Sequence, residues 1–80
     1  MEELLTFLVT SLVDKPESVE ITASSDDEMV TLNCRVDKED MGKVIGKEGK
    51  TIKAIRTLLR TRAGKEGKRV FLILEESLPA

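Results

Sequence analysis

The residues with the clearest capacity for chemistry lie in one string, Val-Ile-Gly-Lys-Glu-Gly-Lys-Thr-Ile, at positions 44–52. Gly46 and Gly49 bracket a Lys-Glu pair, and apolar residues at helical spacing lie on both sides. A turn of this kind leaves backbone N–H groups free at the start of the next helix, where the helix dipole is positive. The lysines around the turn are Lys43, Lys47, Lys50 and Lys53. Such an arrangement suits a phosphodiester backbone as its ligand.

Charge is divided unevenly along the 80 residues. Residues 1–42 carry three cations and eleven acids, a net of −8, whereas residues 43–69 carry ten cations and two acids, a net of +8. This asymmetry favours an interaction surface for a polyanion. The alternative, on charge alone, is that 43–69 is a solvated helical face, because Lys and Arg are good helix formers.

Composition excludes several classes of protein. Eighty residues allow one small domain, and the chain has no histidine, so the commonest acid–base group and metal ligand is missing. The single cysteine, Cys34, excludes an internal disulfide or a Cys-rich zinc site, and we expect it to be a small buried hydrophobe. No apolar run approaches the about 20 residues of a membrane helix, and the Met-Glu-Glu start lacks the positive charge of a secretion signal. We therefore expect a cytoplasmic protein.

Hydrophobic periodicity predicts the elements on the N-terminal side of the turn. Leucines at helical spacing predict an amphipathic helix over residues 2–13. Alternation of apolar and polar residues predicts a strand over 19–23 and a clearer one over 29–36. The polar residues 24–28 between them predict a hairpin turn.

Two helices are expected to flank the turn. Asp37 is a good N-cap for a helix over about 37–45, which Gly46 would end. A second helix is predicted over about 50–63, with Gly64 as its C-terminal cap residue.

A final strand is predicted over 69–74. Its apolar run, 70–74, lacks alternation, which is typical of a strand with both faces covered. The predicted order is α-β-β-α-α-β.

Two glycines three residues apart are a weak signal alone, but their context is more specific. They follow Val-Ile, enclose a lysine, precede Lys-Thr-Ile, and lie between two predicted short helices after a strand. This arrangement resembles the KH domain, and the element order resembles its type II, prokaryotic form. Size and sequence resemble the small bacterial KhpA family over about residues 2–75. The resemblance implies an α+β fold, with a three-stranded mixed sheet and helices packed on one face. It also implies one KH domain over 1–80, with the last few residues loose.

The resemblance also implies a site for single-stranded RNA, or single-stranded DNA, that clamps the sugar–phosphate backbone of about four nucleotides. The clamp residues would be Gly46, Lys47, Glu48 and Gly49. The residues that would extend its positive rim are Lys43, Lys50 and Lys53. The apolar floor for bases would be Val44, Ile45 and Ile52, with side chains from the 29–36 strand. Arg35 would reach base edges or phosphate, although its position suggests the sheet face opposite the core.

Two features of the chain predict weak binding. Glu48 puts a carboxylate beside the expected phosphate path. The chain has no Trp or Tyr, and Phe7 and Phe71 are far from the turn in sequence, so we expect no base-stacking platform in the groove. Binding should then be poorly sequence-selective and steeply salt-dependent, because phosphate contacts would dominate it.

Other signatures are weaker. Gly49-Lys50-Thr51 resembles the end of a phosphate-binding loop, but Val44 stands where the first glycine is needed, so we expect no NTP hydrolysis and no catalysis. The spacing of Gly42 and Gly46 matches a membrane-helix packing motif, but they lie among lysines. The acids at 26–28 suggest a solvated hairpin tip, because they lack calcium-loop spacing. No metal or cofactor is expected.

A protein partner is the second hypothesis. In a type II KH fold the helices pack on one sheet face, so the 70–74 strand would present apolar residues to solvent on the other. The resemblance implies a homodimer, or a heteromer with a larger Jag-type KH protein. It also implies a role as RNA chaperone or post-transcriptional regulator, linked to growth, cell shape and the cell envelope. The alternative is an adaptor that uses the KH fold for assembly and binds RNA weakly or not at all.

Overall fold

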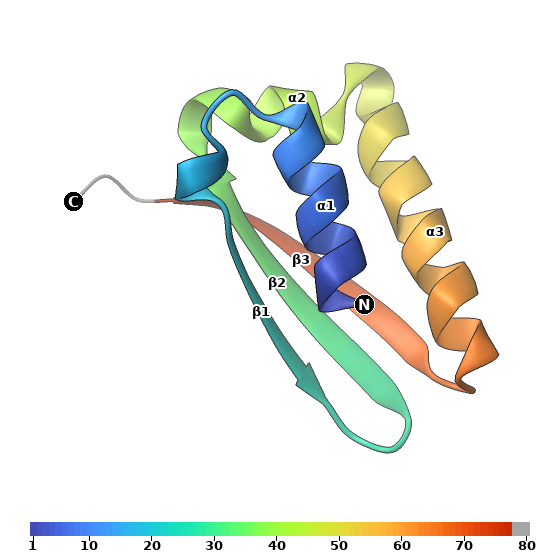
Figure 1. The fold of residues 1–80 in the computed structure, drawn as a ribbon. Coiled ribbons are helices and arrows are strands. Elements are labelled where there is room, and N and C mark those ends of the chain that lie inside the picture. The colour runs from blue at the N-terminus through green and yellow to red at the C-terminus, as the bar shows by residue number, and fades with distance from the viewer. Residues whose placement is uncertain (78–80) are drawn as a thin grey trace.

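A computed structural model describes residues 1–77, which run in the order α-β-β-α-α-β (Figure 1). The helices and strands are α1 (Glu2–Leu12), β1 (Glu20–Ser25), β2 (Met29–Asp37), α2 (Met41–Ile45), α3 (Lys50–Lys65) and β3 (Arg69–Ser77). Short 3₁₀ turns at Pro16–Ser18, Lys38–Asp40 and Lys47–Gly49 join some of them. The order is the one predicted from the sequence. The expectation of a loose C-terminal end falls on residues 78–80, which lie outside the described residues.

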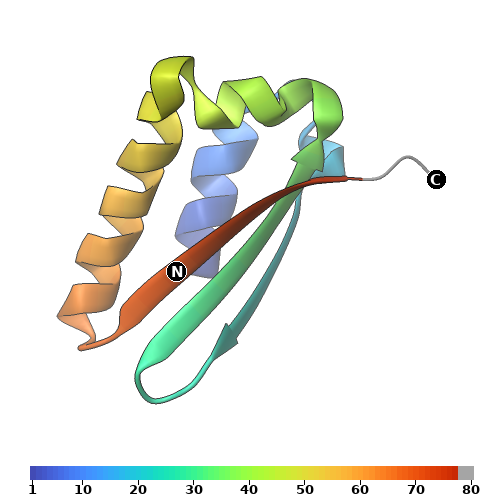
Figure 2. The same ribbon diagram turned by 180° about the vertical axis from the view of Figure 1, so that it is seen from behind.

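Residues 1–77 form one three-stranded mixed sheet in the order β1-β2-β3. β1 pairs antiparallel with β2, and β2 pairs parallel with β3, so that Leu32 lies opposite Leu72 and Thr31 opposite Phe71. The helices pack on one face of this sheet (Figure 1), and the view from behind in Figure 2 shows the other face free of helices in the described part of the chain. The predicted α+β fold of the type II KH order is therefore confirmed.

The core lies between the sheet and the helices. The alternation of β2 sends every second side chain, from Val30 to Val36, into this layer. The buried residues of the core cluster are Leu5, Val9, Val30, Leu32, Cys34, Val36, Val44, Ile52, Ile55, Leu59 and Leu72. Cys34 is a buried free cysteine, as predicted, and its burial raises the pKa of the thiol to about 11.

β3 differs from its prediction in two ways. It continues to Ser77, because it stays paired with β2 to the end of that strand. The prediction that both of its faces are covered is wrong, since Phe71 is 55% exposed. Leu72 points into the core, whereas Phe71 and Ile73 lie on the sheet face without helices. The expectation that this strand presents apolar side chains to solvent is confirmed.

The ends of the two central helices are also set by local hydrogen bonds. Asp37 caps the 3₁₀ turn before α2, accepting the N–H of Glu39 at 2.8 Å, so α2 itself begins only at Met41. The prediction that Gly64 is the C-terminal cap residue of α3 is wrong, because the helix continues to Lys65. The chain turns at Gly67 (φ 71°), where the N–H of Lys68 donates to the carbonyl of Ala63 at 2.9 Å.

Candidate nucleic-acid interface

The loop between α2 and α3 depends on the conformation of its first glycine. Gly46 has φ 76° and ψ 171°, a region that only glycine adopts readily. Its N–H donates to the carbonyl of Gly42 at 2.8 Å and closes α2. A Cβ atom added at Gly46 would lie 2.6 Å from the Cβ of Thr51 and 2.9 Å from its backbone nitrogen. Gly46 therefore allows the loop to turn closely over the start of α3.

The rest of the loop forms a tight turn that ends in the first turn of α3. The N–H of Gly49 donates to the carbonyl of Gly46 at 3.1 Å, and Gly49 is left-handed (φ 74°). Glu48 is also left-handed, with φ 58° and ψ 23°, which is unusual for a residue with a side chain. α3 then begins at Lys50 without a side-chain cap. Its first N–H groups are available to a ligand at the positive end of the helix dipole.

The four lysines around this loop differ in their surroundings. Lys47, Lys50 and Lys53 are exposed, and within residues 1–77 none of them forms an ion pair. Lys43 instead donates to the carboxylate of Asp14, which raises the pKa of Lys43, and lies 3.8 Å from Asp40. The positive field at the loop therefore comes mainly from the three unpaired lysines.

Asp40 fixes α2 relative to the N-terminal part of the chain. It is 2% exposed, and its carboxylate accepts the backbone N–H groups of Asp14 (3.1 Å) and Lys15 (3.0 Å). Burial alone would raise the pKa of Asp40, but these two donors and the Lys43 and Lys15 cations outweigh it and hold the pKa below its usual range. Asp40 is therefore an anchor for the helix that leads into the loop.

The apolar side chains predicted to form the floor lie at different depths. Val44 is fully buried in the core and Ile52 nearly so, whereas Ile45 is 37% exposed next to Gly46. In this structure Val44 and Ile52 support the loop from below, and of these three only Ile45 presents a substantial apolar surface beside it.

Arg35 lies on the sheet face without helices, as its position in β2 suggested. Its Nε donates to Glu75 at 3.2 Å, and a second guanidinium nitrogen lies 3.9 Å from Glu20. The structure therefore does not bring Arg35 together with the lysines of the loop, and its charge is balanced by two acids.

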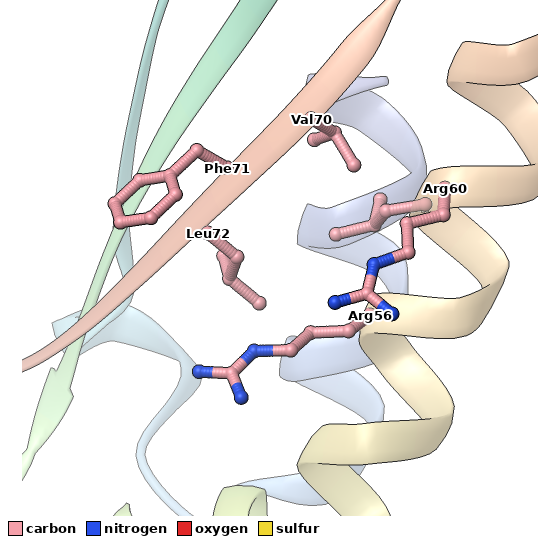
Figure 3. Close-up of a pocket in the computed structure, with 6 residues that line it drawn as sticks. Arg56, Arg60, Val70, Phe71 and Leu72 are labelled. Carbon is pink, nitrogen blue, oxygen red and sulfur yellow. The ribbon is translucent and has the colours of Figure 1, made fainter.

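A groove of about 290 Å³ between α3 and β3 was not predicted from the sequence. Figure 3 shows Arg56 and Arg60 reaching from α3 toward β3, and Val70 and Leu72 pointing back from β3. Helical geometry places Arg56 about 9 Å and Arg60 about 15 Å along α3 from Lys50. Lys53, Arg56 and Arg60 recur every three or four residues, which is the sequence signal that could have revealed this cationic face.

Phe71 also lines this groove. Its ring lies beside β3 on the side away from α3 (Figure 3). The expectation that the groove holds no base-stacking platform stays a prediction, because the ring of Phe71 points away from the groove.

Within residues 1–77, no group of His, Cys, Asp or Glu side chains is arranged to hold a metal ion. None of the helices in the same residues is long and apolar enough to cross a membrane.

Comparison with known proteins identifies the family. The KhpA/KhpB KH domain matches residues 2–74. This chain belongs to that family. A relative from Clostridium perfringens, RNA-binding protein KhpA, is 49% identical over 90% of this chain and 96% of its own length. The proteins of the same name from Listeria monocytogenes and Chlamydia trachomatis are each 47% identical, over 95% of this chain and 100% and 99% of theirs. These family members are named for RNA binding and not for an enzymatic activity.

Two solved structures share the fold of this family member. Era from Aquifex aeolicus, bound to GDP.AlF4-, superimposes with a TM-score of 0.69 at 17% identity, over 95% of this chain and 30% of Era. Era in complex with MgGDPNP and nucleotides 1506–1542 of 16S ribosomal RNA gives 0.67 at 21% identity, over 98% of this chain and 30% of that one. The chain thus spans about a third of Era, and at these identities the likeness establishes the fold.

Proposed function

We propose that this protein binds single-stranded RNA through the Gly46–Gly49 loop and the adjoining groove, and catalyses no reaction. The observation that carries this proposal is a row of cations that form no ion pair with any of residues 1–77, running from the loop along one side of α3. Its members are Lys47, Lys50, Lys53, Arg56 and Arg60. The name and close similarity of the KhpA relatives support the same conclusion.

The loop would hold the backbone of the RNA strand. Gly46 lets the loop turn closely over the start of α3, and the free N–H groups there would donate to the oxygens of a phosphate. Lys47 and Lys50 would add charge-assisted contacts. Glu48, which is exposed at the tip of the loop, would weaken the binding of any phosphate that passes it.

Bases would turn toward the groove, where the half-buried Val70 offers an apolar surface above the buried Leu59 and Leu72. Apolar contacts of this kind discriminate little between bases, since they do not read the hydrogen-bonding edges. Affinity would therefore depend chiefly on phosphate contacts. If all five cations of the row meet phosphates, the logarithm of the binding constant should fall with the logarithm of salt concentration at a slope of about −3.5.

The test is fluorescence anisotropy of a labelled single-stranded RNA pool at several salt concentrations. The wild type is compared with a Lys47→Asp, Glu48→Asp double variant, which adds negative charge but keeps both glycines. Lys38→Asp is the matched control, because Lys38 is an exposed lysine in the 3₁₀ turn before α2 and lies outside the groove. Circular dichroism checks that each variant is folded.

Loss of binding in the double variant alone would support the proposed site. Equal binding by all three proteins would place the RNA elsewhere. If the wild type does not bind single-stranded RNA at low salt, the proposed function is wrong.

The biological role would follow from this mode of binding. A small domain that holds short single-stranded stretches with little selectivity suits an RNA chaperone or post-transcriptional regulator, acting in the cytoplasm. One KH domain would make up residues 1–80, which a core cluster joining α1 to β3 supports.

A second candidate function, assembly with another chain, is favoured by exposed apolar side chains on the helices. Phe7 of α1 is 67% exposed and Leu58 of α3 is 49% exposed. Large exposed apolar side chains on a small domain often mark contacts. The partner would be a second copy or a larger KH protein of the Jag type. Light scattering over a range of concentrations should show a mass above that of the monomer, and a Phe7→Ser, Leu58→Ser variant should remain monomeric.

A further inference from the structure

Phe71 is the most exposed large apolar side chain of the sheet, and its position needs an explanation. It is the third residue of β3, lies on the sheet face without helices, and is 55% exposed. Leaving a phenylalanine in solvent forgoes much of the stabilisation that burial of the ring would give. Phe71 is also among the residues that line the groove to which Arg56 and Arg60 contribute, and its ring points to the other side of β3 (Figure 3).

Apart from Ile73, the side chains around Phe71 on this face are polar or cationic, which favours an anionic, hydrogen-bonding ligand. Its neighbour across the sheet is Thr31, whose hydroxyl makes no hydrogen bond to another of residues 1–77. Next along β2 on this face is Asn33, and Arg69 lies two residues before Phe71 on β3. The groove edge itself is lined by arginines and, among the described residues, by no acid. The nearest acid on this face, Glu75, is held by Arg35 at 3.2 Å.

We propose that Phe71 is a stacking platform for a base outside the clamp, reached by an RNA strand that passes from the groove over the edge of β3. The inference rests on the proposed function and names a subsite for it. Arg56 and Arg60 contact the phosphates between the clamp and this base. Figure 3 shows the arrangement, with the guanidinium groups on the α3 side of β3 and the ring on the other side.

The strand order of the sheet leaves the edge of β3 open to an RNA strand that runs from the groove to Phe71. β3 has a neighbouring strand on one side only within residues 1–77, so its outer edge is free for a strand to cross. The helices cover the opposite sheet face, which leaves the ring accessible from the edge. A base stacked on the ring could also hydrogen-bond to the Thr31 hydroxyl, which lies on the same face, whereas the Asn33 amide already donates to Glu75 at 3.5 Å.

The length of the RNA separates this subsite from the clamp. A tetranucleotide fills the clamp, which holds about four nucleotides, whereas an octanucleotide reaches beyond it. The variant is Phe71→Leu, which removes the ring but keeps an apolar strand residue. Phe71→Tyr restores a ring. Leu12→Ala is the control, since Leu12 is an exposed apolar residue at the end of α1, outside the groove.

We expect Phe71→Leu to weaken binding of a labelled oligoadenylate octanucleotide about fivefold or more, the low end of what one stacked base contributes. The tetranucleotide should bind as it does to the wild type. Phe71→Tyr should bind both oligonucleotides like the wild type, and Leu12→Ala should change the affinity for neither. An octanucleotide with 5-iodouridine near one end should cross-link to the peptide that contains Phe71.

Equal affinity of Phe71→Leu and wild type for the octanucleotide would overturn the proposal, and so would an equal loss for both lengths. A change of mass in light scattering with unchanged RNA affinity would assign Phe71 to a protein contact and overturn it as well. The Lys47→Asp, Glu48→Asp variant decides the proposed function separately, because its effect should appear with both lengths.

Discussion

The two glycines of the loop should respond very differently to alanine, because the structure gives them different constraints. At Gly46 the left-handed φ of 76° with ψ near 171° costs a residue with a side chain on the order of 1–3 kcal/mol. The added Cβ would also lie 2.6 Å and 2.9 Å from Thr51 atoms, and relief of such overpacking costs about 1–3 kcal/mol more. A domain of this size has a free energy of unfolding of roughly 4–12 kcal/mol.

At Gly49 the constraint is φ alone. Its φ of 74° and ψ of 13° fit the ordinary left-handed region, which costs an alanine about 1 kcal/mol. The nearest atom to an added Cβ is Lys53 Cε at 3.9 Å, an ordinary contact. Loss of conformational freedom in the unfolded chain returns roughly 0.4–1 kcal/mol. The net effect of Gly49→Ala should therefore be less than about 1 kcal/mol.

Thermal unfolding followed by circular dichroism measures the difference, with Gly42→Ala as control. For a domain of this size, 1 kcal/mol shifts the midpoint by about 4–8 °C, so Gly46→Ala should lower it by about 10 °C or more and Gly49→Ala by only a few degrees. Gly42 lies inside α2 with open space around it, so Gly42→Ala should raise the midpoint slightly. Equal shifts for Gly46→Ala and Gly49→Ala would refute the steric argument.

Four further predictions follow from single residues. Glu48→Asn should raise the midpoint of thermal unfolding by about 4 °C, since Asn tolerates the left-handed region, and should also tighten RNA binding. Glu48→Gln should tighten RNA binding without raising the midpoint, so thermal unfolding and anisotropy separate the two effects. Lys43→Ala should lower RNA affinity less than Lys50→Ala does, because Lys43 already forms ion pairs with Asp14 and Asp40. Equal losses of affinity in the two variants, measured by anisotropy at low salt, would contradict this. Cys34 should resist iodoacetamide at pH 8 until denaturant unfolds the chain, because it is buried and its pKa is about 11; rapid alkylation of the native protein, seen by mass spectrometry, would show the core to be open. The folded-state pKa of Asp40 lies below 3.8, so the stability that this carboxylate contributes is present above that pH and is lost as the pH falls through the lowered value. Urea unfolding should therefore show that the free energy of unfolding of the wild type exceeds that of Asp40→Asn by less and less below about pH 4.

Most of the fold could be predicted because local rules and tertiary packing agree there. The alternation of apolar and polar residues over β2 allows only one register, since a shift of the strand by one residue would put Val30 and Leu32 into solvent. Gly46 was recognisable as the end of α2 because its positive φ has few alternatives. Gly64 and Gly67 were harder to separate, as either can terminate a helix. Burial of Ala63 keeps the last turn of α3 against the core, so the helix continues to Lys65 and the chain turns at Gly67.

The candidate site was less predictable, because several of its properties depend on contacts between distant parts of the chain. The partner of Lys43 is Asp14, which lies in the segment after α1, and no periodicity in the sequence indicates that contact. The groove likewise exists only because α3 turns back beside β3, which brings Arg56 next to Leu72. Sequence reasoning found the loop, whose chemistry is local, and missed the groove.

The parallel pairing of β2 with β3 has a consequence for how the protein is made. Met29 pairs with Arg69 and Asp37 with Ser77. Each residue of β2 can therefore pair with β3 only after a partner 40 residues later in the chain has been synthesised. The α1 helix and the β1–β2 hairpin can form while the chain is still being translated, since their contacts are closer in sequence. In the sequence, the Gly46–Gly49 loop and α3 come between the two parallel strands, so they are held in place only once β3 has been added. A ribosome-bound chain that ends before β3 should therefore fail to retain RNA, and the binding surface would be completed as the last strand emerges.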